Sequence, residues 1–474
     1  MKKIVIIGGG ISGLAALYYL SKKLKEKKIK ADLHLLEKSE RFGGQIKTEY
    51  VKGFVIDGGS DCFIREKPWA LGLCRELGIE GKLVNTRDEN NGTFIYRKGK
   101  LHPLPEGLMA LVPVRFLPFI TTGLFSLTGK IRMAVEVFIP RKKDDREETL
   151  AEFVTRRSGR ELLDMIAEPL IAGIHAGDPD RMSVKSTFPR FLQMEKDHGS
   201  LTMATLAARK KMKEMMKKQK NSGAPQMSFF ISFKNGMYEF IETLLKKLKD
   251  QKLKTGMDVT GIKKEKSGNY IIGIKGGKEI KADVVVITTP AYVSAQLLRN
   301  ISRDMSVSMK KIPYVKTGTI TIAYKKKDVE KVLPRAFGFL VPGVEKRNLM
   351  AATFTSLKWP GRCPDDFVLI RCFIGGKHNQ DLIDKDDETI ITIAREELKA
   401  ILGIDAEPHL TRVFRWIDNM PQYNLGHLEL METIDRETGK NKGLHVTGSA
   451  YRGIGIPDCI HNAEITAGKI IEEI

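Results

Sequence analysis

The sequence is short of cysteine and of long apolar runs, and both shortages limit what the chain can be. Its 474 residues include only five cysteines, an odd number, and no C-x-x-C pair. Neither a disulfide framework nor a structural zinc site is therefore expected, and a reducing compartment is indicated. No stretch of about 18 uncharged apolar residues occurs, so we predict no membrane-spanning helix. These absences indicate a cytoplasmic globular protein.

Acidic residues are outnumbered by basic ones, 58 against 79, which gives a net charge of +21. Such a surplus attracts anions, whether nucleic acid, anionic lipid or an acidic substrate, although lysine also serves plain solubility. Aromatic residues make up only 7% and are not interleaved with basic residues as in a base-stacking surface. We therefore expect no nucleic acid partner. A polycarboxylate substrate or an acidic membrane surface explains the charge better.

The chain does contain a glycine motif at its beginning. Gly8, Gly10 and Gly13 follow an apolar strand and precede a segment with helical periodicity. In this spacing the first glycine permits a tight turn, the second lets a pyrophosphate approach, and the third lets helix and strand pack closely. A second strand, residues 32–36, ends in Glu37, which can accept a hydrogen bond from a ribose hydroxyl. The pattern predicts a dinucleotide-binding βαβ unit.

Further elements follow from local patterns. A second glycine pair, Gly43 and Gly44, follows Arg41, which is a candidate phosphate or ribose contact. We predict helices over residues 68–77, 149–171, 209–220, 236–248, 386–402 and 460–474, a hairpin over 93–102, and strands over 53–59, 227–233, 283–290, 317–324, 367–373 and 443–448. At this length two or three domains are expected.

The most apolar part of the chain, residues 107–140, has two interpretations. It carries Arg115, Lys130 and Arg132 at intervals among large apolar side chains. The commoner outcome is a pocket lining or a set of core helices. The alternative is a segment that lies on a membrane surface with its basic residues at the headgroups.

A second glycine motif follows the strand at residues 443–448. Gly453 and Gly455 precede the closing helix. Ligands in open α/β sheets bind at the carboxyl ends of the strands, so this motif should lie near the first glycine loop. The nucleotide-binding domain is then discontinuous, and this arrangement suits FAD better than NAD.

Several motifs together give the chain a more specific resemblance. The N-terminal loop with Glu37 and residues 41–44 resembles the FAD-dependent amine oxidase superfamily. Within it, the chain is similar to the coproporphyrinogen III oxidases of Gram-positive type, formerly called protoporphyrinogen oxidases. The similar segments are residues 59–67, 101–105, 122–126, 174–178, 420–427 and 453–459.

The resemblance implies a set of cofactor contacts. It assigns the pyrophosphate to the first glycine loop, the ribose to Glu37 and Lys38, and the adenine to the backbone of Val259. Residues expected near the flavin come from four parts of the chain. The full set is Gly8, Gly9, Gly10, Ile11, Ser12, Gly13, Glu37, Lys38, Arg41, Gln45, Gly59, Ser60, Asp61, Cys62, Val259, Trp416, Ile454, Gly455 and Ile456.

The resemblance also implies the reaction. It is a six-electron oxidation of coproporphyrinogen III, and of protoporphyrinogen IX as a second substrate, in which dioxygen is reduced to hydrogen peroxide. Lys67, with Arg65 as the weaker candidate, is expected to bind a substrate carboxylate, and Lys67→Ala to raise KM more than it lowers kcat. No catalytic side chain and no metal ligand is predicted, and His175, Asp178 and His427 are expected to be structural.

The expected architecture is an α/β fold with a Rossmann-like FAD-binding domain in three pieces, a β-rich substrate domain and an inserted helical domain. The predicted boundaries are 1–60, 227–297 and 413–474 for the first, 61–95 and 298–412 for the second, 96–205 for the third and 206–226 for a basic linker. The implied partners are the porphyrinogen, dioxygen, a membrane surface and other haem-pathway enzymes. An FAD-dependent amine oxidase or a carotenoid desaturase is the alternative enzyme, and a membrane-surface flavoprotein scaffold is the alternative without turnover.

Overall fold

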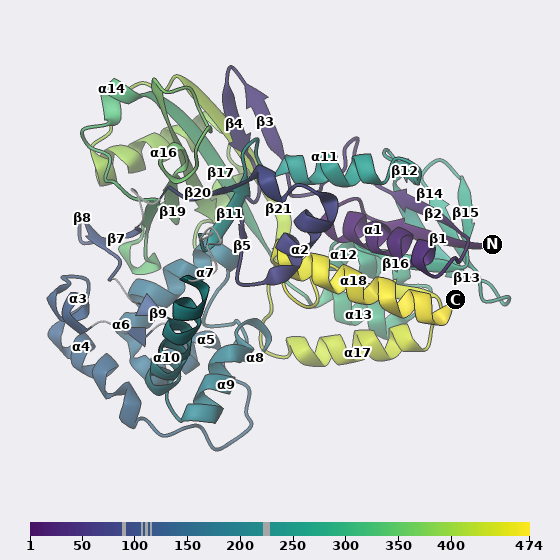
Figure 1. Ribbon diagram of the computed structural model, residues 1–474, viewed down its shortest axis with the longest axis horizontal. Helices are drawn as coiled ribbons and strands as arrows, with labels where there is room; N and C mark the ends of the chain where they lie inside the picture. Colours follow the sequence, from purple (N-terminus) through teal and green to yellow (C-terminus); the bar gives the residue numbers. More distant parts are fainter. Residues whose placement is uncertain (88–91, 106–107, 110–111, 114–115, 221–227) are drawn as a thin grey trace. The chain divides into compact units, whose positions relative to one another are not determined.

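A computed structural model describes residues 1–87, 92–105, 108–109, 112–113, 116–220 and 228–474, and it divides the chain into two compact units (Figure 1). The first unit contains residues 1–85, 228–313 and 426–474, and the second contains 86–227 and 314–425. The first unit is therefore built from three separate segments, one at each end of the chain and one in its middle. The finer division into cofactor, substrate and helical domains stays a prediction.

The first unit is built on a parallel five-stranded sheet with the order β12-β2-β1-β16-β22. Its central strand β1 (Lys2–Ile7) pairs with β2 (Ala31–Leu36) on one side and with β16 (Val284–Ile287) on the other. Residues 4–7 are almost fully buried, as the continuous apolar run predicts for a strand covered on both faces. The last strand, β22 (Leu444–Val446), extends β16 in parallel, so the predicted contribution of the C-terminal segment to this sheet is confirmed.

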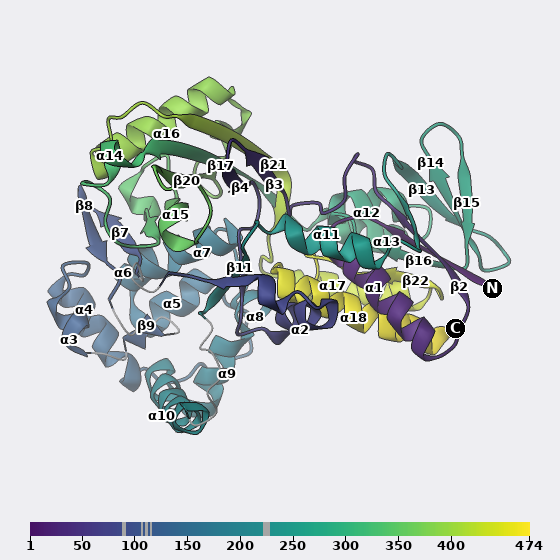
Figure 2. The ribbon, with the colours of Figure 1, turned by 45° about the horizontal axis from the view of Figure 1, so that its top comes forward.

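Helices and smaller sheets complete the first unit. Helix α1 (Ile11–Glu26) lies beside α18 (Ile456–Glu473), which also packs on α2 (Pro68–Leu77) (Figures 1 and 2). The remaining elements are β3 (Thr48–Val51), β4 (Phe54–Asp57), β5 (Phe63–Ile64), β6 (Leu83–Asn85), β11 (Phe230–Phe233), α11 (Tyr238–Lys247), β12 (Lys252–Lys254), β13 (Val259–Lys264), β14 (Tyr270–Ile274), β15 (Glu279–Ala282), α12 (Ala291–Leu298), α13 (Arg303–Lys310) and α17 (His427–Gly439).

The second unit contains a seven-stranded mixed sheet with the order β21-β17-β20-β19-β18-β7-β8. Its long strands β17 (Tyr314–Lys325), β20 (Phe367–Gly375) and β21 (Leu410–Pro421) pair antiparallel, and α16 (Asp387–Leu402) contributes Ile390 and Leu398 to the same core. The predicted hairpin is confirmed as β7 (Phe94–Arg97) and β8 (Lys100–Pro103). The sheet also includes β18 (Gly338–Leu340) and β19 (Ala351–Phe354), with the short helices α14 (Lys326–Val329) and α15 (Thr355–Lys358).

The helical part of the second unit departs from the sequence prediction. The predicted helix over residues 149–171 is interrupted, because Gly159 adopts a φ of +95° and a π-helical turn occupies Leu163–Ala167. The observed helices are α3 (Phe116–Thr121), α4 (Leu127–Ala134), the 3-10 turn Val135–Phe138, α5 (Leu150–Ser158), α6 (Arg160–Leu162), α7 (Glu168–His175), α8 (Val184–Thr187), α9 (Pro189–His198) and α10 (Leu201–Lys220), with a ribbon of β9 (Leu108–Met109) and β10 (Val112–Pro113). The predicted basic helix ends with α10. Residues 221–226 of the predicted linker, and residue 227 of the predicted strand, lie outside the described residues.

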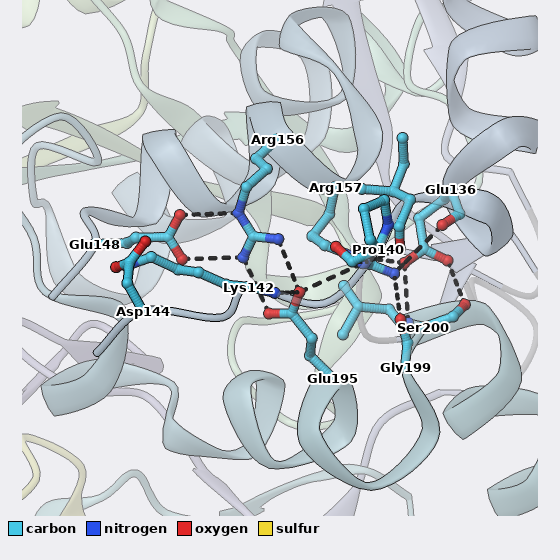
Figure 3. A network of polar contacts seen from close by, with 12 residues as sticks. Glu136, Pro140, Lys142, Asp144, Glu148, Arg156, Arg157, Glu195, Gly199 and Ser200 are labelled. Atoms are coloured by element: carbon cyan, nitrogen blue, oxygen red, sulfur yellow. Dashed lines mark hydrogen bonds and ion pairs between the residues drawn. The ribbon is translucent and has the colours of Figure 1, made fainter. Parts of the chain in front are cut away.

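Charged side chains occupy the interior of this helical part (Figure 3). Arg157 is fully buried and its Nε donates to Glu136 at 2.8 Å, while Glu136 also accepts from the hydroxyls of Ser200 at 2.7 Å and Thr202 at 2.6 Å. Neighbouring Arg156 binds two carboxylates, those of Glu148 and Glu195, with bonds of 2.7–3.0 Å. Because each buried charge has a partner, the network holds α5, α9, α10 and the turn after α4 in one arrangement.

Candidate functional site

The first glycine loop joins β1 to α1, and each of its glycines meets a different environment. Gly8 has a φ of +110°, and a Cβ there would lie 2.6 Å from Oγ1 of Thr288. A Cβ at Gly13 would lie 1.9 Å from the carbonyl oxygen of Gly8. A Cβ at Gly10, in contrast, would have no atom of the described residues within 4 Å, apart from those of its two chain neighbours. Gly8 and Gly13 are therefore required by the fold, whereas Gly10 leaves open space at the first turn of α1.

The first turn of α1 is suited to an anion. Gly10 is the N-cap residue and provides no side-chain hydrogen bond, and no acidic residue lies in the first turn. The first N–H groups of a helix have no partner within the helix and carry the positive end of its dipole. Together with the open space at Gly10, this geometry fits a bound pyrophosphate, with Ile11 and Ser12 in the turn that would hold it.

The second glycine pair lies directly against the first loop. The N–H of Gly43 donates to the carbonyl of Gly9 at 2.8 Å, and Gly10 and Gly43 form a parallel bridge. Arg41 donates to the carbonyls of Phe42, Gly44 and Ile46 at 2.5–3.2 Å, so its guanidinium supports this loop. Its predicted ligand contact stays a prediction.

Glu37 lies at the end of β2 and points to the same loop. Its carboxylate accepts from the N–H of Gly9 at 2.6 Å and from the N–H and hydroxyl of Ser39 at 2.8 and 2.7 Å. A carboxylate offers about four lone-pair positions, so three bonds leave one for a ribose hydroxyl. Beside it, Lys38 lies 3.4 Å from Asp258, the residue before Val259, and the N–H of Met257 donates to the carbonyl of Glu37 at 2.8 Å. The fold thus brings the Val259 segment to Glu37.

The segment between β22 and α18, which contains the C-terminal glycine motif, reaches the first loop at Gly448. Gly448 follows β22, and a Cβ there would lie 3.9 Å from Oγ of Ser12, as the rule for parallel sheets predicts. The predicted start of the closing helix is wrong by four residues, since α18 begins at Ile456 with Gly455 as its N-cap. Pro457 at the second helical position was the signal for this earlier start.

Lys67, the predicted substrate contact, has a partner in this C-terminal motif. Its Nζ lies 2.7 and 2.6 Å from the two carboxylate oxygens of Asp458. Lys67 is the N-cap residue of α2, and Asp458 lies in the first turn of α18. Arg65, two residues earlier, is exposed. Asp458 lies within the motif at residues 453–459, and no role is predicted for it from the sequence, because only the fold places it beside Lys67.

The other predicted flavin contacts lie in four parts of the chain. Gln45 precedes β3, residues 59–62 connect β4 to β5, and the hydroxyl of Ser232 donates to the carbonyl of Asp61 at 2.6 Å. Ile454 precedes Gly455, and Ile456 is buried at the start of α18. Trp416 lies on β21 of the second unit, opposite Thr317. The contacts of these residues with flavin stay predictions.

Thr288 is a residue of this site that sequence reasoning missed. It follows β16, and its hydroxyl donates to the carbonyls of Ile7 at 3.0 Å and Gly8 at 2.9 Å. It therefore fixes the turn that begins the glycine loop. No local sequence signal identified it, because only the fold shows that β16 adjoins β1 and ends at the same edge of the sheet.

The three polar residues expected to be structural have structural contacts. His427 is buried and its Nε2 lies 3.0 Å from the carbonyl of Tyr451. Asp178 pairs with Lys377 at 2.7 Å, and the ring of His175 contacts that of Phe188 edge to face. Among the described residues, no group of three or more His, Cys, Asp or Glu side chains is arranged to hold a metal ion.

Comparisons with known proteins cover the whole chain. The model of the flavin-containing amine oxidoreductase family matches residues 11–471. The coproporphyrinogen III oxidase of Bacillus subtilis is 35% identical over 97% of this chain and 96% of its own length. The chloroplastic protoporphyrinogen oxidase 1 of Spinacia oleracea is 28% identical over 99% and 84%. A solved structure from Exiguobacterium sp. 255-15, assigned as a protoporphyrinogen oxidase, matches with a TM-score of 0.86 and 29% identity over 100% and 99%.

Proposed function

The chain belongs to the flavin-containing amine oxidoreductase family, and from this premise we propose that it is an FAD-dependent coproporphyrinogen III oxidase. The observation that carries the proposal is the 35% identity to the Bacillus subtilis coproporphyrinogen III oxidase over 97% of the chain. The reaction converts coproporphyrinogen III and three dioxygen molecules to coproporphyrin III and three hydrogen peroxide molecules. Protoporphyrinogen IX is a second substrate, in keeping with the similarity to plant protoporphyrinogen oxidases.

The cofactor proposal is supported by the first glycine loop. The open space at Gly10 and the uncapped first turn of α1 suit a pyrophosphate, and Glu37 lies 2.6 Å from the N–H of Gly9 with an acceptor position left for a ribose. When bound, FAD accepts a hydride from the substrate and passes the electrons to dioxygen.

The protein's own contribution is binding and orientation. The glycine loop binds the diphosphate, Glu37 orients the ribose, and Lys67 attracts a carboxylate of the tetrapyrrole. We propose no catalytic acid or base. The protein would instead accelerate the reaction by holding the reacting carbon of the substrate in position against the cofactor.

A direct assay tests the proposed function. The purified protein, loaded with FAD, is mixed with coproporphyrinogen III in air, and the appearance of porphyrin fluorescence is followed against a blank without protein. We expect acceleration with coproporphyrinogen III and slower turnover of protoporphyrinogen IX. A fully FAD-loaded protein that accelerates neither reaction would contradict the proposal.

Peripheral contact with a membrane is proposed for the helical part of the second unit. Among the described residues of the segment 107–140, Phe119, Leu124 and Phe125 belong to the core, whereas other large side chains face solvent, which supports the proposal. The outward side chains on α4 and the turn after it are Leu127, Ile131, Val135 and Phe138, which are 75, 57, 36 and 81% exposed. Arg115 of the same stretch lies outside the described residues.

The charged residues of α4 and the turn after it point the other way. Glu136 is buried against Arg157, Arg132 donates to the carbonyls of residues 155–157, and Lys130 donates to the carbonyl of Ile120. Four large apolar side chains of this segment therefore face outward, while Glu136 is buried and Lys130 and Arg132 bond to backbone carbonyls, although Met133 of α4 packs in the core. Such an outward apolar face is unusual for a helix on a soluble surface. Arg141 and Lys143 are exposed just beyond Phe138, which favours an anionic lipid surface as the occupant of this face. No helix in the described part of the chain is both long and apolar enough to span a membrane.

A further inference from the structure

The ion pair between Lys67 and Asp458 joins two segments with separate predicted roles. Lys67 is the predicted substrate contact, and Asp458 belongs to the terminal motif that is expected to approach the flavin. The two residues are 391 positions apart in the sequence. Both oxygens of Asp458 bind the same ammonium group, at 2.7 and 2.6 Å.

The position of Asp458 is fixed by its surroundings. Its side chain is 13% exposed, and it packs so closely on Gly453 that a Cβ there would lie 2.5 Å from Cβ of Asp458. Gly453 has a φ of +100°, which side-chain-bearing residues rarely adopt. The carboxylate also lies in the first turn of α18, where the helix dipole favours a negative charge.

A second contact holds the two helix starts together. Trp69, in the first turn of α2, stacks on His461 of α18 with ring centroids 4.0 Å apart and an interplanar angle of 10°. The stack lies within three residues of both members of the ion pair. Lys67 is therefore tied to a rigid support, although its own side chain remains 41% exposed.

The ion pair with Asp458 changes how strongly the Lys67 ammonium group attracts a substrate carboxylate. A lone ammonium group would attract any carboxylate with its full charge. Paired with Asp458, it keeps a donor free towards solvent, but much of its field is neutralised by the carboxylate beside it. The paired ammonium group is therefore a hydrogen-bond donor with a fixed position, and it attracts anions less strongly than an unpaired, mobile lysine would.

We propose that Asp458 is a positioning and specificity-determining residue, which holds the Lys67 ammonium against the C-terminal glycine motif and lowers its attraction for substrate carboxylates. The inference rests on the proposed function, since it takes a polycarboxylate porphyrinogen as the substrate. Weaker ground-state attraction with better orientation raises turnover, because binding energy common to substrate and transition state does not increase kcat.

The test is a double-mutant cycle with Asp458→Asn, Lys67→Ala and the combined variant. Each FAD-loaded protein is titrated with coproporphyrin III in the dark, and kcat and KM are measured with coproporphyrinogen III. We expect Asp458→Asn to lower the Kd for coproporphyrin III about two- to fivefold, the range that a partly exposed ion pair supplies. The same substitution should lower kcat about threefold or more, because the Lys67 ammonium group, no longer paired, would not be held in a single position. Lys67→Ala should raise KM more than it lowers kcat.

The cycle separates positioning from a merely structural role. In the Lys67→Ala background, Asp458→Asn should change neither Kd nor kcat by more than about twofold, because the ammonium group that Asp458 positions is absent. The matched control is Glu239→Gln, since Glu239 lies in the first turn of α11 and pairs with exposed Lys82 at 2.8 Å. This control should leave coproporphyrin III binding unchanged.

Three outcomes are informative: two would contradict the inference about Asp458, and one would contradict the proposed function. If the wild-type protein turns over and Asp458→Asn changes only thermal stability or FAD content, the inference is wrong and the proposed function stands. If Asp458→Asn changes Kd and kcat as much in the Lys67→Ala background as in the wild type, the inference is also contradicted. If the FAD-loaded wild type shows no turnover, the proposed function itself is contradicted.

Discussion

At the scale of single residues, the first glycine loop separates folding from ligand binding. A Cβ at Gly13 would meet the carbonyl of Gly8 at 1.9 Å, whereas a Cβ at Gly10 would meet nothing within 4 Å. Gly10 also has a φ of −74° and a ψ of −175°, which any residue can adopt. Its lack of a side chain has no explanation within the protein, so a ligand is the natural reason for it.

Two alanine variants test this distinction. Gly10→Ala should lower the free energy of unfolding by less than about 1 kcal/mol, the cost of a poorer N-cap, yet weaken FAD binding at least about tenfold, because the methyl group occupies the open space. Gly13→Ala should destabilise the protein by about 1–3 kcal/mol through overpacking. Chemical denaturation without FAD and flavin titration measure the two effects. Normal FAD affinity in Gly10→Ala would argue against a pyrophosphate at this turn.

The buried carboxylate of Glu136 makes a pH prediction. Burial alone would raise its pKa, but hydrogen bonds from Thr202, Ser200 and Arg157 outweigh this and hold the pKa below its ordinary value. A carboxyl group with a lowered folded-state pKa stabilises the protein above its unfolded pKa of about 4.3, and this contribution is lost as the pH falls through the folded-state pKa. We therefore expect the melting temperature to drop below about pH 4.3.

Glu136→Gln should remove part of this pH dependence. The variant removes the nearer of the two carboxylates that pair with buried Arg157, the other being Glu195 at 3.4 Å. It should therefore cost up to about 3–5 kcal/mol at pH 7, and its melting temperature should fall less than that of the wild type between about pH 5 and about pH 2. Glu265→Gln is the control, because Glu265 pairs with Lys281 on the surface. Parallel melting curves for wild type and Glu136→Gln over this pH range would contradict the assignment.

At the scale of elements, α4 and the turn after it show that an apolar face at helical spacing can point to solvent instead of the core. Leu127, Ile131, Val135 and Phe138 recur at helical spacing, and such a stripe usually faces a core. Here the network around Arg157 occupies the inside instead, so the apolar stripe faces out. The sequence pattern identifies two faces of the helix, but only the packing decides which of them is exposed.

Vesicle binding tests the proposed occupant of this apolar face. Ile131→Asp should reduce sedimentation with vesicles that contain phosphatidylglycerol at least about fivefold, without lowering the melting temperature, because Ile131 is 57% exposed. Val332→Asp, in the same unit and 43% exposed, is the matched control and should bind vesicles as the wild type does. Equal loss of binding in both variants, or none in either, would exclude this face as the membrane contact.

At the scale of the whole molecule, the net charge of +21 should influence substrate capture. A tetracarboxylate is drawn towards such a protein more strongly than a dicarboxylate, and salt screens this attraction. We expect kcat/KM for coproporphyrinogen III to fall about tenfold between 50 and 500 mM salt, more steeply than for protoporphyrinogen IX. Equal salt dependence for the two substrates would mean that the surface charge does not distinguish them.

The parts of this protein with a local physical cause could be predicted from its sequence. The strand, the glycine turn, helix α1 and Glu37 lie within 37 residues, and the glycine positions follow from a tight turn at Gly8, close packing at Gly13 and open space at Gly10. Family-specific motifs added the expected cofactor and reaction, and the comparisons support both.

The tertiary structure decided what depends on distant contacts. It placed Asp458 beside Lys67 across 391 positions, Thr288 beneath the first glycine turn, and the apolar face of α4 towards solvent. None of these could be read from spacing, because each depends on which surfaces the folded chain brings together, and periodicity describes only one element at a time. The glycine loop could be identified in the sequence, whereas the Asp458 carboxylate beside Lys67 could not.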